Sequence, residues 1–230
     1  MRWLLTLVVG LSAGFAGAAV WDATGLGGKS TRAYLLANPE VLPEAMEVLQ
    51  QREQAARIEP LRGELETPFP GAVLGNPAGS VTLVEFSDYA CTYCRQSVAD
   101  VTALIAANPD LRVVVHEYPI LAPESVEAAR MALAAAQQGR YARFHDAMFR
   151  LGPPSAASIE AAAREAGVDL AKARGAIDSG MFDAQLRQNA TLAGSLGISG
   201  TPGWIVGDRA LNGAVGEAAM SEAIAQARRT

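Results

Sequence analysis

Cysteine, histidine and runs of basic residues are all scarce in this chain. Its 230 residues include two cysteines and two histidines, and charged residues make up 19% of them. The formal net charge is -5 with no long basic stretch, which argues against nucleic-acid binding. A structural zinc site needs four ligands, and His116 and His145 lie on separate predicted elements, so zinc is disfavoured. Hydrophobic residues make up 50% of the chain, which provides a globular core and argues against global disorder.

Charge is also absent from most of the N-terminal segment. After Arg2 the next charged residue is Asp22, and the residues between them are first apolar and then small. This pattern predicts a signal peptide over residues 1–20, with cleavage near Ala18 or Ala19, or an uncleaved membrane anchor. Either interpretation places the rest of the chain outside the cytoplasm, in the periplasm or another extracytoplasmic space. Disulfides persist in such compartments.

Residues 29–59 are predicted to form a helical stalk. Asn38 is suited to cap a helix, and Pro39 to occupy its first turn. Apolar residues recur there every seven positions, at Leu35, Leu42, Leu49 and Ala56. A stripe this narrow needs a partner surface, which is either the domain that follows in the same chain or other copies in a dimer or trimer.

The rest of the chain has the pattern of a linker and one α/β domain. Residues 60–71 are rich in Pro and Gly and predict a linker; residues 72–230 predict the domain. Strands are expected over 80–86, 111–120 and 201–208, a hairpin partner over 209–215, and helices over 94–108, in a block of four or five over 123–196, and near the C-terminus. This order predicts a small α/β sheet with a helical insertion.

The two cysteines, Cys91 and Cys94, lie between a predicted strand and a predicted helix. At a helix start, unpaired N–H groups and the helix dipole favour a thiolate, so we expect Cys91 to be the solvent-exposed nucleophile. Cys94 is one turn later and close enough to attack a mixed disulfide at Cys91, so we expect it to be the more buried resolving thiol. Together the positions predict thiol–disulfide chemistry.

Two other roles for this pair stay open beside redox exchange. A structural disulfide between near neighbours closes a short loop and would contribute little stability. A copper(I) site needs only two soft thiolates and is compatible with Cys91 and Cys94.

The motifs VEFSDYACTYC and GISGTPGWIVGD, more than a hundred residues apart, resemble those of DsbA-like thiol–disulfide oxidoreductases of the thioredoxin superfamily. The resemblance covers residues 72–230. The segment RAYLLANPEVLPEAMEVLQ looks like the helical extension of the ScsC- and Com1-like branch, which uses it to oligomerise. The resemblance implies an α/β thioredoxin fold with a helical insertion, preceded by an N-terminal helical stalk.

The resemblance also implies roles for further residues. Pro202 would follow Thr201 through a cis peptide bond and pack against the cysteines, leaving the Thr201 backbone free to pair with a substrate strand. The alternative is an ordinary turn at the start of a strand. Glu85 would be an acidic group near the buried cysteine that assists proton transfer, or else it faces solvent at a strand end. His116 and Glu117 are expected to be structural polar groups, and His145 a surface residue.

The dipeptide between the cysteines, Thr92 and Tyr93, bears on the direction of the reaction. Strongly oxidising DsbA proteins typically have histidine where this chain has Tyr93, and a neutral tyrosine stabilises a thiolate less. We therefore expect an isomerase or reductase of protein disulfides, with a DsbA-type oxidase as the alternative. The candidate catalytic residues are Cys91, Cys94 and Glu85. No organic cofactor or metal is required, and a membrane redox partner would reset the pair.

Overall fold

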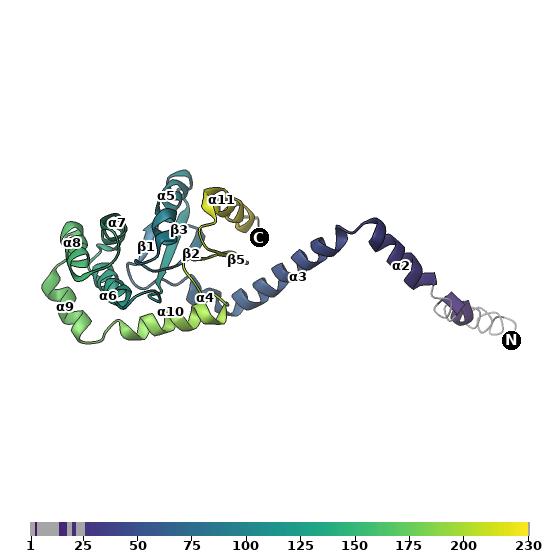
Figure 1. The fold of residues 1–230 in the computed structure, drawn as a ribbon, viewed down its shortest axis with the longest axis horizontal. Coiled ribbons are helices and arrows are strands. Elements are labelled where there is room, and N and C mark those ends of the chain that lie inside the picture. Colours follow the sequence, from purple (N-terminus) through teal and green to yellow (C-terminus); the bar gives the residue numbers. More distant parts are fainter. Residues whose placement is uncertain (1–2, 4–13, 18–19, 22–25, 230) are drawn as a thin grey trace. The chain divides into compact units, whose positions relative to one another are not determined.

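The computed structural model describes residues 3, 14–17, 20–21 and 26–229. The signal peptide predicted over residues 1–20 lies largely outside these described residues. Within them, no helix combines the length and the apolar character needed to cross a membrane. The chain divides into two compact units, residues 1–50 and 51–230 (Figure 1).

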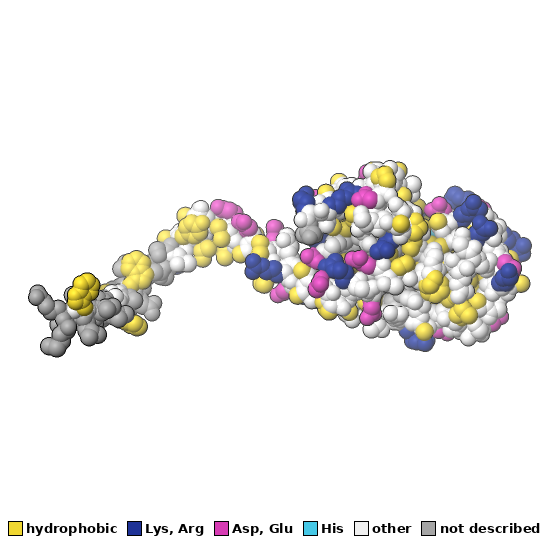
Figure 2. Space-filling view, turned by 180° about the vertical axis from the view of Figure 1, so that it is seen from behind, with side chains coloured by type: hydrophobic (Ala, Val, Ile, Leu, Met, Phe, Trp, Pro, Cys, Tyr) yellow, Lys and Arg dark blue, Asp and Glu magenta, His cyan; other side chains and the backbone are white. Residues whose placement is uncertain are grey.

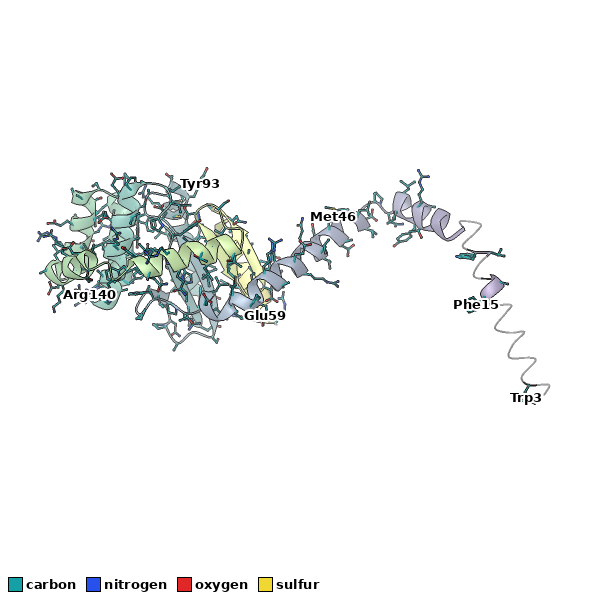
Figure 3. All side chains as sticks on the ribbon, turned by 90° about the horizontal axis from the view of Figure 1, so that it is seen from below. Trp3, Phe15, Met46, Glu59, Tyr93 and Arg140 are labelled. Atoms are coloured by element: carbon teal, nitrogen blue, oxygen red, sulfur yellow. The ribbon has the colours of Figure 1, made fainter. Side chains whose placement is uncertain are left out.

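Helix α2 (Leu26–Ala37) and the first part of α3 (Val41–Ile58) make up most of the described part of the first unit. Asn38 ends α2, because its backbone and side-chain N–H groups each lie 2.9 Å from the Tyr34 carbonyl oxygen. Its side chain thus closes the preceding helix and does not cap the following one. Apolar side chains gather on the surface of this region (Figure 2), and Met46 is labelled among them in Figure 3. The large apolar side chains of α2 and α3 that are exposed are Tyr34, Leu36, Leu42, Met46, Val48 and Leu49.

A five-stranded mixed sheet forms the centre of the second unit. Its strands are β1 (Val73–Gly75), β2 (Val81–Ser87), β3 (Leu111–Glu117), β4 (Gly203–Val206) and β5 (Arg209–Asn212), in the order β1-β3-β2-β4-β5. Strands β2 and β3 are parallel, and the other pairs are antiparallel. The two parallel strands are almost continuously buried, as expected for strands covered on both faces.

Helices cover both faces of this sheet (Figure 1). They are α5 (Thr92–Ala107), α6 (Pro123–Gln137), α7 (Tyr141–Leu151), α8 (Ala156–Ala166), α9 (Leu170–Asp178), α10 (Asp183–Ser195) and α11 (Gly216–Ala227). Side chains alternate between two cores along each strand. Leu83 of β2 belongs to a large core with α5, α6, α7 and α11, and Val84 belongs to a smaller core with α10. The predicted helical insertion therefore consists of α6 to α10.

The segment expected to be a linker is more ordered than its composition indicates. Residues 59–61 form a 3-10 helix, η1 (Glu59–Leu61), and α4 (Arg62–Leu65) follows directly. Ile58 and Leu65 are each 1% exposed and belong to the smaller core. Burial of two such side chains stabilises the attachment by about 1.5–3 kcal/mol each. The Pro and Gly pattern did not reveal this, because these two apolar residues are isolated in the sequence.

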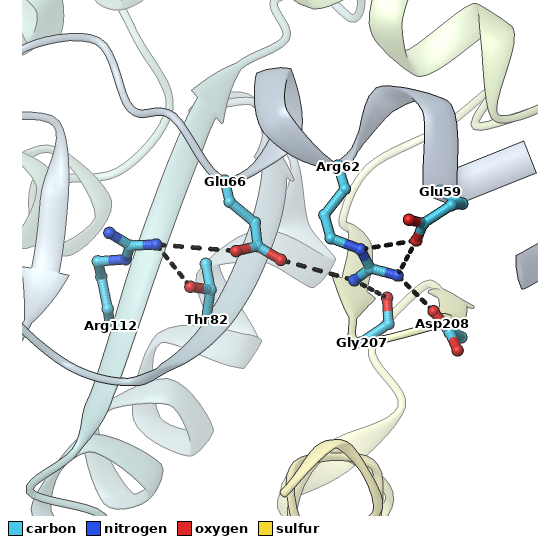
Figure 4. Close-up of polar contacts among 7 residues, drawn as sticks. All are labelled: Glu59, Arg62, Glu66, Thr82, Arg112, Gly207 and Asp208. Carbon is cyan, nitrogen blue, oxygen red and sulfur yellow. Dashed lines mark hydrogen bonds and ion pairs between the residues drawn. The ribbon is translucent and has the colours of Figure 1, made fainter. Parts of the chain in front are cut away.

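Polar contacts supplement this attachment (Figure 4). Arg62 donates to the Gly207 carbonyl at 3.2 Å and pairs with Glu59 and Asp208, which joins η1 and α4 to the β4–β5 turn. Glu66 lies between Arg62 and Arg112 at 3.6 and 3.9 Å. These groups are partly exposed, so each pair contributes at most about 1 kcal/mol. Apolar burial is therefore the main force that holds residues 58–66 on the sheet.

Candidate active site

Cys91 is the N-cap of α5, in the position predicted from the sequence. Its backbone is extended (φ -76°, ψ 118°), and its sulfur accepts the Cys94 backbone N–H at 3.1 Å. The first N–H groups of a helix have no partner within the helix, so a sulfur at the N-cap satisfies one of them. The helix dipole adds favourable potential for a negative sulfur there.

The pKa values of the two thiols are shifted in opposite directions. A hydrogen bond from the Cys94 thiol lowers the pKa of Cys91 to about 6, against the effect of burial, and the Thr201 side chain and backbone N–H groups of α5 contribute further. Burial, the hydrogen bond to Cys91 and the nearby Glu85 charge raise the pKa of Cys94. At neutral pH the pair therefore holds one thiolate, on Cys91, and one thiol, on Cys94.

The expectation that Cys91 is exposed to solvent is wrong, because the residue is almost completely buried. Cys91 is 3% exposed and Cys94 0%, so the order is as predicted but both sulfurs are buried. The loop before β4 covers Cys91, whose sulfur lies 3.2 Å from the Thr201 carbonyl oxygen. Tyr93, between the cysteines, is 60% exposed and projects from the surface (Figure 3).

The Thr201–Pro202 peptide bond is cis, as the family resemblance implied. Pro202 is buried and Thr201 half-buried, directly before β4. The Thr201 hydroxyl is buried and makes no hydrogen bond of ordinary geometry, although it lies close enough to Cys91 to help lower the pKa of that thiol. A buried hydroxyl of this kind can donate a hydrogen bond to a negatively charged sulfur at Cys91.

Glu85 lies in the middle of β2, opposite Val115 and Trp204 in the ladder, and is 3% exposed. Burial raises its pKa to about 7, the nearby Ser87 hydroxyl opposes this, and the Cys91 charge adds to it. The carboxyl is thus in electrostatic reach of both sulfurs, which favours the proton-transfer interpretation over a solvent-facing one. It lines a cavity of ≈ 190 Å³ between α5 and α7, which His145 and Asp146 also line.

A polar cluster beside the cysteines was not predicted. The Tyr89 and Tyr141 hydroxyls donate to one carboxylate oxygen of Glu117, at 3.1 and 2.8 Å. His145, expected on the surface, is buried, and burial lowers its pKa to about 4. The sequence holds a signal for this correction, because His145 follows Tyr141 and Phe144 at helical spacing on an apolar face.

Asp88 and His116 also prove to be structural polar groups of the core. The Asp88 carboxylate accepts the backbone N–H groups of Ala90, Ile120 and Leu121 at 2.8 to 2.9 Å. His116, which was expected to be structural, is buried with its Nε2 atom 2.9 Å from the Leu65 carbonyl oxygen. Among the described residues, no group of three or more His, Cys, Asp or Glu side chains is arranged to hold a metal ion.

A family comparison agrees with this geometry. Residues 82–225 match the DSBA-like thioredoxin domain, and residues 29–56 match the copper resistance protein ScsC N-terminal domain. The chain belongs to the DSBA-like thioredoxin family. The expected thioredoxin fold with an N-terminal helical extension is thereby confirmed, as is the membership of a family of thiol–disulfide oxidoreductases.

Solved structures of similar DsbA-like proteins include a thioredoxin-like oxidoreductase from Silicibacter pomeroyi. It is 40% identical, with a TM-score of 0.66 over 69% of this chain and 92% of that one. A linker-deletion variant of Proteus mirabilis ScsC is 23% identical, with a TM-score of 0.67 over 86% of this chain and 92% of that one. The second likeness extends into the helical extension and concerns the fold alone.

A similar curated protein is described as an antiporter. The Na(+)/H(+) antiporter NhaA 3 of Salinispora tropica is 29% identical over 161 residues, which are 67% of this chain. The matched region spans 24% of that protein's length. The chain therefore corresponds to about a quarter of this relative.

Proposed function

We propose that this chain is an exported thiol–disulfide oxidoreductase that acts on protein disulfides as an isomerase or reductase. The observation that carries the proposal is the sulfur of Cys91, held at the start of α5 with its pKa lowered to about 6. A thiolate is the attacking species in disulfide exchange, and an optimum nucleophile has a pKa near the ambient pH.

The exchange begins with attack by the Cys91 thiolate on one sulfur of a substrate disulfide. The substrate S–S bond breaks, a mixed disulfide with Cys91 forms, and the second substrate sulfur leaves as a thiolate and takes up a proton. In isomerisation, another substrate thiolate attacks the mixed disulfide and frees Cys91, with no net transfer of electrons. Backbone groups of Thr201, beside Cys91, would pair with the substrate chain during these steps.

In reduction, Cys94 completes the reaction. Glu85 accepts the Cys94 proton, the Cys94 sulfur attacks Cys91, and the substrate leaves with both sulfurs reduced. The Cys91–Cys94 disulfide now holds the oxidised state, so two electrons have moved from the chain to the substrate. An external dithiol, which we place on a membrane redox partner, must then reduce this disulfide.

Direction and activity are tested together. The wild type is expected to reactivate scrambled ribonuclease, and Cys91→Ala to reduce reactivation to the background rate. The reduction potential is expected to be clearly more negative than the value of about -120 mV that marks strong oxidants, because Tyr93 is neutral and the Cys91 pKa of about 6 lies well above that of those proteins. A potential near -120 mV would instead identify an oxidase.

Copper(I) binding is a second candidate role for the pair. Two neighbouring sulfurs are soft ligands, and the N-terminal helices match a domain described from a copper resistance protein. Tight copper(I) binding by the reduced wild type, together with no reactivation of ribonuclease, would favour this role. Ribonuclease reactivation by the wild type that is lost in Cys91→Ala would instead support the enzymatic role.

Self-association is proposed for the N-terminal helices, because α2 and α3 expose large apolar side chains. Native mass measurement is expected to give a dimer or trimer for the chain and a monomer for a protein beginning at Gln51. This start keeps Ile58 in the core, which a later truncation would remove. Leu42→Gln with Leu49→Gln serves as a full-length control and is also expected to be monomeric. A monomeric full chain contradicts the proposal.

A further inference from the structure

A second buried carboxyl contacts the loop that precedes Cys91 and takes no part in the exchange steps above. Glu117 ends β3 and is 1% exposed. Its oxygen Oε1 accepts the hydroxyls of both Tyr89 and Tyr141. Burial raises its pKa to about 8, while the two hydroxyls oppose that shift, so the protonated acid predominates at pH 7. Buried carboxyls are usually paired with a cationic side chain. Here two hydroxyl groups form the hydrogen bonds to the carboxyl instead.

Tyr89 connects this carboxyl to the nucleophile, because it lies two residues before Cys91. Its ring packs against Phe144 and Phe149 of α7, with centroids 5.9 and 4.9 Å apart. Its hydroxyl also lies 3.4 Å from Nδ1 of His145. The ring is thus enclosed, and the bond to Glu117 fixes its outer end.

Asp88, next to Tyr89, also holds the loop before Cys91 to the segment that follows β3. Asp88 binds the backbone N–H groups of Ile120 and Leu121, three and four residues after Glu117, and its carbonyl accepts the Cys91 N–H at 3.0 Å. Two consecutive side chains, Asp88 and Tyr89, therefore fasten the loop before Cys91 to residues 117–121.

We propose that Glu117 is a positioning residue for Cys91: through the Tyr89 hydroxyl it holds the loop that places the Cys91 sulfur against the first turn of α5. The proposal rests on the proposed function of Cys91 as the nucleophile. The sulfur is stabilised by an N–H group 3.1 Å away, and a hydrogen bond of that length weakens quickly when the loop shifts. Loss of the Tyr89–Glu117 bond therefore destabilises the thiolate without removing any group that touches it.

Two matched variants test this. Tyr89→Phe and Tyr141→Phe each remove one buried hydroxyl from the same oxygen of Glu117, but only Tyr89 belongs to the loop before Cys91. In the reduced protein, iodoacetamide alkylation of Cys91 near pH 6 is expected to be about twofold slower in Tyr89→Phe, which corresponds to a rise of about half a pKa unit from the starting pKa of about 6. Tyr141→Phe is expected to alkylate like the wild type, although both variants are expected to be destabilised to a similar extent in thermal unfolding.

Glu117 itself supplies the second pair of variants. Glu117→Gln keeps an oxygen that accepts both hydroxyls and is expected to alkylate like the wild type, whereas Glu117→Ala is expected to behave like Tyr89→Phe. This pair decides the question if Tyr89→Phe does not fold. Equal slowing in both tyrosine variants, unchanged alkylation in Tyr89→Phe, or slowing by Glu117→Gln as large as by Glu117→Ala would overturn the proposal. Alkylation needs no turnover, so a failure here is distinct from failure of ribonuclease reactivation by the wild type.

Discussion

A Cys94→Ala protein is expected to accumulate as a mixed disulfide with its substrate. In the wild type, Cys94 lies beside Cys91, and in the proposed mechanism it attacks the mixed disulfide within the molecule. Without it, only an external thiol can release the substrate, so we expect insulin reduction to slow at least about 100-fold, since an intermolecular step replaces a positioned one. Non-reducing electrophoresis and mass spectrometry of the adduct provide the measurement.

The matched control is Cys91→Ala, which retains the other sulfur. Burial, the hydrogen bond to Cys91 and the Glu85 charge all raise the pKa of Cys94 in the wild type, and this residue is completely buried. Cys91→Ala is therefore expected to form no adduct. Adducts on Cys94 in that variant, or multiple turnovers by Cys94→Ala at the wild-type rate, would contradict the assignment of nucleophile and resolving thiol.

Replacing Glu85 by Gln is expected to change how stability depends on pH. The pKa of Glu85 is about 7 in the folded protein, raised by burial above the ordinary value of 4.5 for a glutamate carboxyl. The folded state therefore binds its proton more tightly than the unfolded state, and its contribution to stability falls as the pH rises from about 4.5 to 7. We therefore compare the free energy of unfolding of Glu85→Gln with that of the wild type. This difference should shift in favour of the variant by on the order of 3 kcal/mol between pH 4 and pH 8.

Urea unfolding of both reduced proteins at several pH values gives this difference directly. Taking the difference between variant and wild type cancels most of the pH dependence contributed by other groups, including Cys91 and His145. Glu124→Gln, at an exposed position, is the control for removing a surface carboxyl. A difference between wild type and Glu85→Gln that does not change with pH would show that Glu85 titrates normally and would remove its proposed part in proton transfer.

Local features of the sequence sufficed for strands β2 to β5, the insertion and the position of the cysteines. Strand β2 is recognisable because it is short, apolar and β-branched, and Cys91 follows it before an amphipathic helix. The cis bond before Pro202 came from the family resemblance and not from the residues alone. These features depend on neighbours in the chain or on a motif.

What the sequence did not reveal depends on contacts between distant segments. Cys91 is covered by Thr201, 110 residues away, which is why its exposure was overestimated. Tyr89 and Glu117 are 28 residues apart, and nothing local indicates that their side chains meet. His145 could have been recognised as buried from its helical face.

Titration of the Cys91 thiolate in the reduced protein tests the central claim most directly. Ultraviolet absorbance of the thiolate, followed against pH and compared with Cys91→Ala, should give a pKa of about 6. A value near 9, the ordinary value for a cysteine thiol, would mean that the start of α5 does not activate this sulfur, and would contradict the proposed exchange chemistry.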